Sequence, residues 1–139
     1  MKLSKKSEYA CLAIIDLTEN QDKEWTKIID ICSRKKIPKK FLEQILVSLK
    51  NSGFVRSKKG SDGGYKLNKP ATEITIAEVI RLMDGALAPV ESVSKYFYES
   101  SPIEQSPQLL SIFQDIRDYI CDKLENTSFQ DLCKQKSTT

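Results

Sequence analysis

The fold is decided by residues 38–67, which read PKKFLEQILVSLKNSGFVRSKKGSDGGYKL. In the first half of this stretch apolar residues recur at helical spacing, with Pro38 in the first turn and Gly53 just after the end. We therefore expect a helix from about Pro38 to Ser52. At 100° per residue one stripe of this helix faces a core, and it consists of Leu42, Ile45, Leu46 and Leu49.

A β-hairpin is predicted to follow this helix directly. Residues 54–58 and 65–67 have strand character, and the glycine-rich segment 59–64 between them is typical of a turn. A shorter helix is predicted before residue 38, with Thr26 as its cap and residues 35–38 as the turn that ends it. Two helices joined by about four residues and followed by a lysine-tipped hairpin have the order of a winged helix-turn-helix.

Further helices are predicted on both sides of this unit, so the expected fold class is mainly α with a small β-hairpin wing. Residues 86–106 are rich in Ser and contain Pro, and they are predicted to be a linker with some local structure. The remaining predicted helices are Ser4 to about Asn20 with Ser4 as its cap, Ile76 to Asp84 after the cap Thr75, Pro107 to Asn126, and a short one through Leu132 that Thr127 or Ser128 caps.

Charge divides the chain into two unlike halves. Residues 1–70 hold 16 Lys and Arg against 8 Asp and Glu, whereas residues 71–139 hold 6 against 11. A basic half indicates contact with a polyanion such as nucleic acid, although a lysine-rich solvated surface gives the same count. We expect residues 1–84 to form a winged helix-turn-helix DNA-binding domain and residues 85–139 to form a linker and a helical dimerisation region.

Composition argues against an enzyme and against a secreted protein. Histidine is absent, which removes the commonest general base and the commonest transition-metal ligand. The four cysteines are widely spaced, and no leader or run of about 18 apolar residues occurs, so a cytoplasmic location is expected. Asp115, Asp118 and Asp122 share a face of the long helix, but with Arg117 and Lys123 beside them a solvated surface is the simpler interpretation.

The outward face of the helix from Pro38 offers side chains that can read base edges. In a helix-turn-helix the N-terminal part of the second helix enters the major groove. Glu43 can accept a bond from cytosine N4, Gln44 can pair with adenine, and Lys40 can reach guanine or a phosphate. The wet face of any amphipathic helix presents such residues too. The predicted readout residues are Lys40, Phe41, Glu43 and Gln44, and the predicted backbone or minor-groove contacts are Lys2, Lys5, Lys6, Lys39, Lys58 and Lys59.

Several motifs resemble the Rrf-two (Rrf2) family of transcriptional regulators. They cover residues 1–90 well and continue loosely through the long helix. The most specific are Phe41-Leu-Glu-Gln44 and, at this separation, Gly60-x-x-Gly-Gly-Tyr65. The others are Met1-Lys-Leu-Ser4 before Tyr9-Ala10, Gly53-Phe-Val-Arg-Ser57, Ile74-Thr-Ile76, and Asp84-Gly-Ala-Leu-Ala-Pro-Val90.

The resemblance implies a homodimer that binds a roughly palindromic operator and is joined mainly by the long C-terminal helix. That helix carries an apolar stripe with spacings of 4, 3, 4 and 4 residues. A repressor is the expected mode of regulation. The predicted dimerisation residues are Leu109, Phe113, Ile116, Ile120 and Leu124.

The chain departs from the cluster-binding members of that family. Those members carry three closely spaced cysteines after the fourth helix, whereas residues 89–108 here contain neither Cys nor His. Thiolate is the usual protein ligand of an iron–sulfur cluster, so no cofactor is expected. Cys121 and Cys133 are the nearest thiols, and a redox role for either stays open, as does a cluster shared across a dimer.

Other functions of the same fold stay open. A winged helix can serve as a protein-interaction or thiol-based redox-sensing module, and fold alone does not decide between them. A regulatory partner protein or a small-molecule effector is expected to act on residues 86–106, where Tyr96, Phe97 and Tyr98 are consecutive aromatics.

Overall fold

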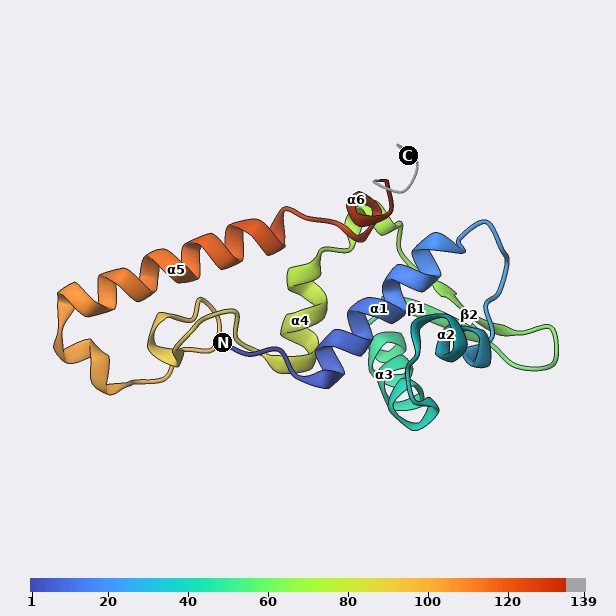
Figure 1. Ribbon diagram of the computed structural model, residues 1–139, viewed down its shortest axis with the longest axis horizontal. Helices are drawn as coiled ribbons and strands as arrows, with labels where there is room; N and C mark the ends of the chain where they lie inside the picture. Colours follow the sequence, from blue (N-terminus) through green and yellow to red (C-terminus); the bar gives the residue numbers. More distant parts are fainter. Residues whose placement is uncertain (135–139) are drawn as a thin grey trace.

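The computed structural model describes residues 1–134 and is mainly helical (Figure 1). Among these residues no helix is long and apolar enough to cross a membrane. In chain order the elements are α1 (Lys5–Glu19), α2 (Ile28–Lys35), α3 (Lys39–Asn51), β1 (Val55–Lys58), β2 (Gly64–Leu67), the 3₁₀ turn η1 (Ala71–Glu73), α4 (Ile76–Asp84), the 3₁₀ turns η2 (Glu91–Val93) and η3 (Pro102–Gln105), α5 (Pro107–Glu125) and α6 (Phe129–Lys134).

The winged helix-turn-helix is confirmed. Lys36 closes the turn between α2 and α3 in the left-handed conformation, with its N–H donated to the carbonyl of Cys32. After α3, β1 and β2 pair antiparallel, from Val55 opposite Leu67 to Lys58 opposite Gly64. We call β1, β2 and the turn between them, residues 55–67, the wing.

The main core lies between α1, α2, α3 and the base of the wing. All four residues of the predicted α3 stripe are buried in it, which confirms the helical periodicity. The carboxylate of Asp16 in α1 is also fully buried, and Arg34 of α2 donates two bonds to it, at 2.8 and 3.0 Å. A buried carboxylate is costly without such a partner, so this pair holds α2 in one orientation on α1.

The predicted helix caps are confirmed at three of four positions. The hydroxyl of Ser4 accepts the N–H of Ser7, and that of Thr75 accepts the N–H of Glu78. At the third of these, Ser128 before α6, the hydroxyl accepts the N–H of Asp131. Thr26 is wrong as a cap, because Lys27 precedes α2 and no side chain caps it. Instead, the backbone of Thr26 pairs with Tyr65 of β2, and its side chain is buried.

The C-terminal part leaves the winged unit and returns to it. In Figure 1 α5 extends to the left, away from the wing, with residues 86–106 beneath it. α6 then packs on α1 and η1, where Phe129 is fully buried in the main core. Phe129 donates its N–H to the carbonyl of Ile74, and Thr127 accepts the N–H of Ile76. Sequence periodicity did not indicate this return.

Candidate nucleic-acid interface

α3 presents a polar face on the side opposite its core stripe. Lys40, Glu43 and Gln44 are all exposed there, as predicted for readout, together with Val47. Lys39 lies 4.0 Å from Glu43, at the limit of an ion pair between two exposed side chains. Such pairs contribute little, so both groups are available to a partner. α3 protrudes from the lower edge of the molecule in Figure 1.

Phe41 lies at the margin of this face. The residue is 47% exposed, and its ring contacts the ring of Tyr9 in α1, with centroids 5.7 Å apart. The contact places the first turns of α1 beside the N-terminal half of α3. Lys2, Lys5 and Lys6 at that end of α1 are exposed, and Lys5 pairs with Glu8 at 3.5 Å.

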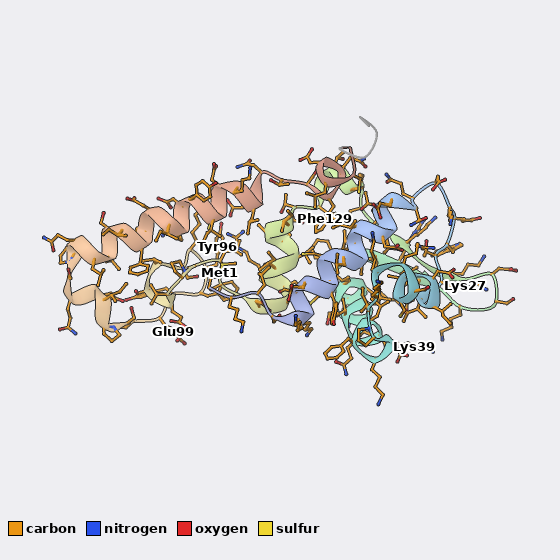
Figure 2. The ribbon with its side chains drawn as sticks, viewed as in Figure 1. Met1, Lys27, Lys39, Tyr96, Glu99 and Phe129 are labelled. Atoms are coloured by element: carbon orange, nitrogen blue, oxygen red, sulfur yellow. The ribbon has the colours of Figure 1, made fainter. Side chains whose placement is uncertain are left out.

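The wing lies on the other side of α3. Lys58 and Lys59 are exposed at its tip, which extends from the right end of the molecule in Figure 1. The structure therefore places the predicted lysines of α1 and of the wing on two sides of α3. Figure 2 shows Lys27 near the wing and Lys39 on α3. Lys27 and Lys50 are two further exposed lysines of this unit, and the sequence analysis did not predict a role for either of them.

A pair of backbone hydrogen bonds fixes the wing to the body. Thr26 donates to the carbonyl of Tyr65 at 2.9 Å, and Tyr65 donates to the carbonyl of Thr26 at 2.7 Å. Gly64 permits this approach, because a Cβ there would lie 2.4 Å from the Thr26 carbonyl oxygen, and its φ is +147°. On the other face of the wing the indole of Trp25 lies near Arg56 and Lys66.

The outer face of α5, which consists of Leu109, Ile112, Ile116 and Tyr119, is exposed. Of the predicted stripe, Leu109 and Ile116 are exposed, whereas Ile120 and Leu124 pack against a second small core of Ala77, Ile80, Leu87 and Cys121. Two apolar residues outside the predicted stripe are more exposed, Ile112 at 57% and Tyr119 at 72%. Leu109, Ile112, Ile116 and Tyr119 follow one another at intervals of 3, 4 and 3 residues, a spacing typical of residues at the contact between two packed helices.

Polar contacts join α4 to the end of α5. Arg81 of α4 donates to the carboxylate of Glu125 at 2.6 Å and stacks over the ring of Tyr96. Lys95 lies 3.7 Å from the same carboxylate. The hydrogen bond from Arg81 lowers the pKa of Glu125 below its usual value. This joint fixes the direction in which α5 leaves the winged unit.

The four cysteines belong to four different helices, α1, α2, α5 and α6. In residues 1–134 no three potential ligands among His, Cys, Asp and Glu come together. Cys121 is buried and faces α4, with its thiol 3.6 Å from the Leu87 carbonyl, so it does not lie on the outer face of α5. Burial, with a smaller effect of Asp84, raises the pKa of Cys11 to about 11, and burial also raises the pKa of Cys32. Raised thiol pKa values disfavour the thiolate that binds metal or reacts with oxidants.

The linker between α4 and α5 carries an exposed aromatic group. Tyr96, Phe97 and Tyr98 are all exposed, although Phe97 lies close to Gly85 and the hydroxyl of Tyr98 bonds to Glu104. Figure 2 shows Tyr96 in the region beneath α5. The fold thus leaves the predicted effector segment accessible.

Comparison with known proteins found transcriptional regulators that are similar to this chain. The model of the Rrf2 family, described as an iron-dependent transcriptional regulator, matches residues 3–135. CymR of Bacillus subtilis, an HTH-type transcriptional regulator, is 29% identical over 132 residues, which are 95% of this chain and 89% of CymR. IscR of Pectobacterium atrosepticum is 30% identical over 98% of this chain and 81% of IscR.

Two further comparisons concern coverage and fold. A protein of Mycobacterium tuberculosis, named as an HTH-type transcriptional regulator, is 41% identical over 67% of this chain. The match spans only 58% of the length of that relative. The solved structure of CymR, described as the global cysteine regulator of B. subtilis, superposes with a TM-score of 0.79 at 27% identity. That superposition covers 97% of this chain and 98% of CymR.

Proposed function

The chain belongs to the Rrf2 family of transcriptional regulators, and from this premise we propose that it binds a palindromic operator as a homodimer and acts as a repressor in the cytoplasm. The observation that carries the proposal is the outward face of α3. Lys40, Glu43 and Gln44 are exposed on the helix that a helix-turn-helix inserts into the major groove, and basic residues flank it on both sides.

The proposal assigns different tasks to different side chains. Glu43 and Gln44 select bases, because a carboxylate accepts from cytosine and an amide pairs with adenine. Lys40 and Phe41 complete the readout, with Phe41 against a thymine methyl or a sugar. Lys2, Lys5, Lys6, Lys39, Lys58 and Lys59 contact the backbone or the minor groove, which sets affinity and register without carrying base information.

Dimerisation is proposed through the outer face of α5. Four exposed apolar side chains, which form the proposed seam, lie along one face of α5 at the spacing of two packed helices. A contiguous exposed apolar patch of this kind is typical of an interaction surface. Leu109 and Ile116 belong to the predicted stripe, and Phe113, Ile120 and Leu124 lie beside the seam, where they are half-buried. Two winged units joined in this way present two copies of α3 to successive major grooves, about one helical turn apart.

The proposal includes no iron–sulfur cluster. Although the family is described as iron-dependent, residues 89–108 offer no thiolate or imidazole, and Cys11 and Cys32 have raised pKa values. The signal is instead proposed to reach the protein as a partner protein or a small molecule at Tyr96, Phe97 and Tyr98. Loss of response after replacing all three with alanine tests that part.

Selection of bound sequences from random duplex DNA tests the proposed function. We expect a palindromic consensus, and we expect log K for that operator to fall with log salt with a slope of roughly −5 to −10 for a dimer. Equal affinity for single strands, or a flat salt response, would refute the proposal. Either result would favour a protein-interaction role for the same fold.

A further inference from the structure

A cleft of about 510 Å³ opens between the wing, the start of α2 and the end of α3. Four lysines line it: Lys58 and Lys59 from the wing, Lys27 from the residue before α2, and Lys50 from the last turn of α3. No Asp or Glu is among the lining residues. Within residues 1–134 none of the four lysines forms an ion pair. Four cations from three elements therefore share one concave surface with no internal counter-charge.

The backbone around this cleft is held in place. Lys27 directly follows Thr26, whose two backbone bonds to Tyr65 hold the wing beside the start of α2. Gly63 and Gly64 make the fit possible, because a Cβ on Gly63 would lie 1.9 Å from the Lys58 carbonyl oxygen. The Cα positions that carry Lys27, Lys58 and Lys59 are thus fixed relative to one another. Such preorganisation distinguishes the cleft from a group of lysines on a free loop.

We propose that this cleft seats one phosphate of the DNA backbone, and that Lys27 and Lys50 are positioning residues that set the angle of α3 in the groove. The inference rests on the proposed function. Lys50 lies one turn after Val47 on α3, so the cleft continues the face proposed to read bases. The anion that a duplex offers beside its groove is a backbone phosphate, which lysine binds as a point charge.

The experiment uses the full chain and an operator obtained by selection. Each backbone phosphate of the operator is replaced in turn by an uncharged methylphosphonate, and affinities are measured for the wild type, Lys27→Gln and Lys50→Gln. Lys23→Gln is the matched control, because Lys23 is an exposed lysine of the same unit that does not line the cleft. Thermal unfolding of each variant checks that the fold is intact.

We expect Lys27→Gln and Lys50→Gln to weaken operator binding about tenfold and to reduce the salt slope of a dimer by about 2, one for each lost phosphate contact. At one phosphate in each half-site, the methylphosphonate should weaken the wild type more than either variant, because each variant has already lost one of the lysine contacts to that phosphate. Lys23→Gln should behave as the wild type at every position.

Several results would overturn the inference without touching the proposed function. If the wild type binds its operator but both variants match Lys23→Gln, the cleft has no part in binding. If the losses of binding free energy caused by a lysine substitution and by a methylphosphonate are additive at every operator position, no single phosphate occupies the cleft. If the cleft instead binds a free phosphate compound, no methylphosphonate position in the operator should affect the wild type and the variants differently. Failure of the wild type to bind any duplex would instead refute the proposed function itself.

Discussion

At the scale of single residues, α3 divides its side chains between the core and the groove. Replacing Glu43 or Gln44 with alanine should reduce the preference for the operator over duplexes with one changed base by about 1–3 kcal/mol for each lost pair. Lys58→Ala and Lys59→Ala should weaken binding to all duplexes alike. Affinities for a panel of duplexes at constant salt measure both effects, and identical behaviour of the two sets would contradict the assigned tasks.

Residue chemistry also determines what the purified protein should contain. With no thiolate or imidazole in residues 89–108, protein purified without oxygen should show no absorption band between about 300 and 500 nm. Iron analysis and the visible spectrum measure this directly. A brown protein with stoichiometric iron would show that thiols from two copies of the chain combine into a cluster.

At the scale of elements, the wing depends on Gly64. In Gly64→Ala the new Cβ would collide with the Thr26 carbonyl, so we expect a loss of about 2–3 kcal/mol of stability and a displaced wing. Trp25 reports that displacement, because the Lys66 ammonium lies 4.8 Å from its ring. Its fluorescence emission should shift in the variant.

Gly60→Ala is the control for that prediction. Gly60 has a φ of +101°, but a Cβ there would meet nothing within 4 Å. The substitution should therefore cost about 1 kcal/mol from backbone conformation alone and leave the Trp25 emission unchanged. An emission shift of equal size in both variants would show that backbone strain, and not the Thr26 contact, holds the wing.

The joint between α4 and α5 should make stability depend on pH. Because the pKa of Glu125 is lowered in the folded state, its ion pair contributes stability above the usual carboxyl pKa, and this is lost as pH falls through the folded value. Glu125→Gln should therefore lower the free energy of unfolding at pH 7 by about 1 kcal/mol or less. The difference should shrink as pH falls below the usual carboxyl pKa of about 4.3, and it should vanish only below the lowered folded value, where the carboxyl is protonated in both states.

Urea unfolding at a series of pH values measures this difference. Glu73→Gln is the control, because Glu73 is exposed and forms no ion pair within the described part of the chain. It should not change the stability at pH 7. A Glu125→Gln difference that did not shrink as pH fell below the usual carboxyl pKa would mean that packing, and not charge, accounts for it.

At the scale of the whole molecule, the outer face of α5 should decide the oligomeric state. Ile112→Asp or Tyr119→Asp places a charge in the proposed seam and should convert a dimer to a monomer at micromolar concentration. Operator affinity should fall about a hundredfold, because two half-sites are then bound independently. Ser111→Asp, at an exposed position beside the seam, should remain dimeric in sedimentation equilibrium. A monomeric wild type would refute the dimer.

Local sequence patterns predicted much of the fold and part of the candidate site. The α3 stripe from Leu42 to Leu49, the caps Ser4 and Thr75, and the wing all depend on spacing or turn chemistry within a few residues. The exposure of Glu43 and Gln44 followed from the same periodicity. Their contacts with DNA stay a prediction, as does the boundary of the domains near residue 84.

What the sequence determined by itself was the set of helices, the wing, the basic half and the absence of Cys and His from residues 89–108. Only the tertiary structure decided that Thr26 pairs with the wing, that Phe129 returns to the main core, and that Ile112 and Tyr119 are the exposed apolar residues of α5. The reason is physical. Backbone preferences act between near neighbours, whereas the face that stays in water depends on where distant segments pack.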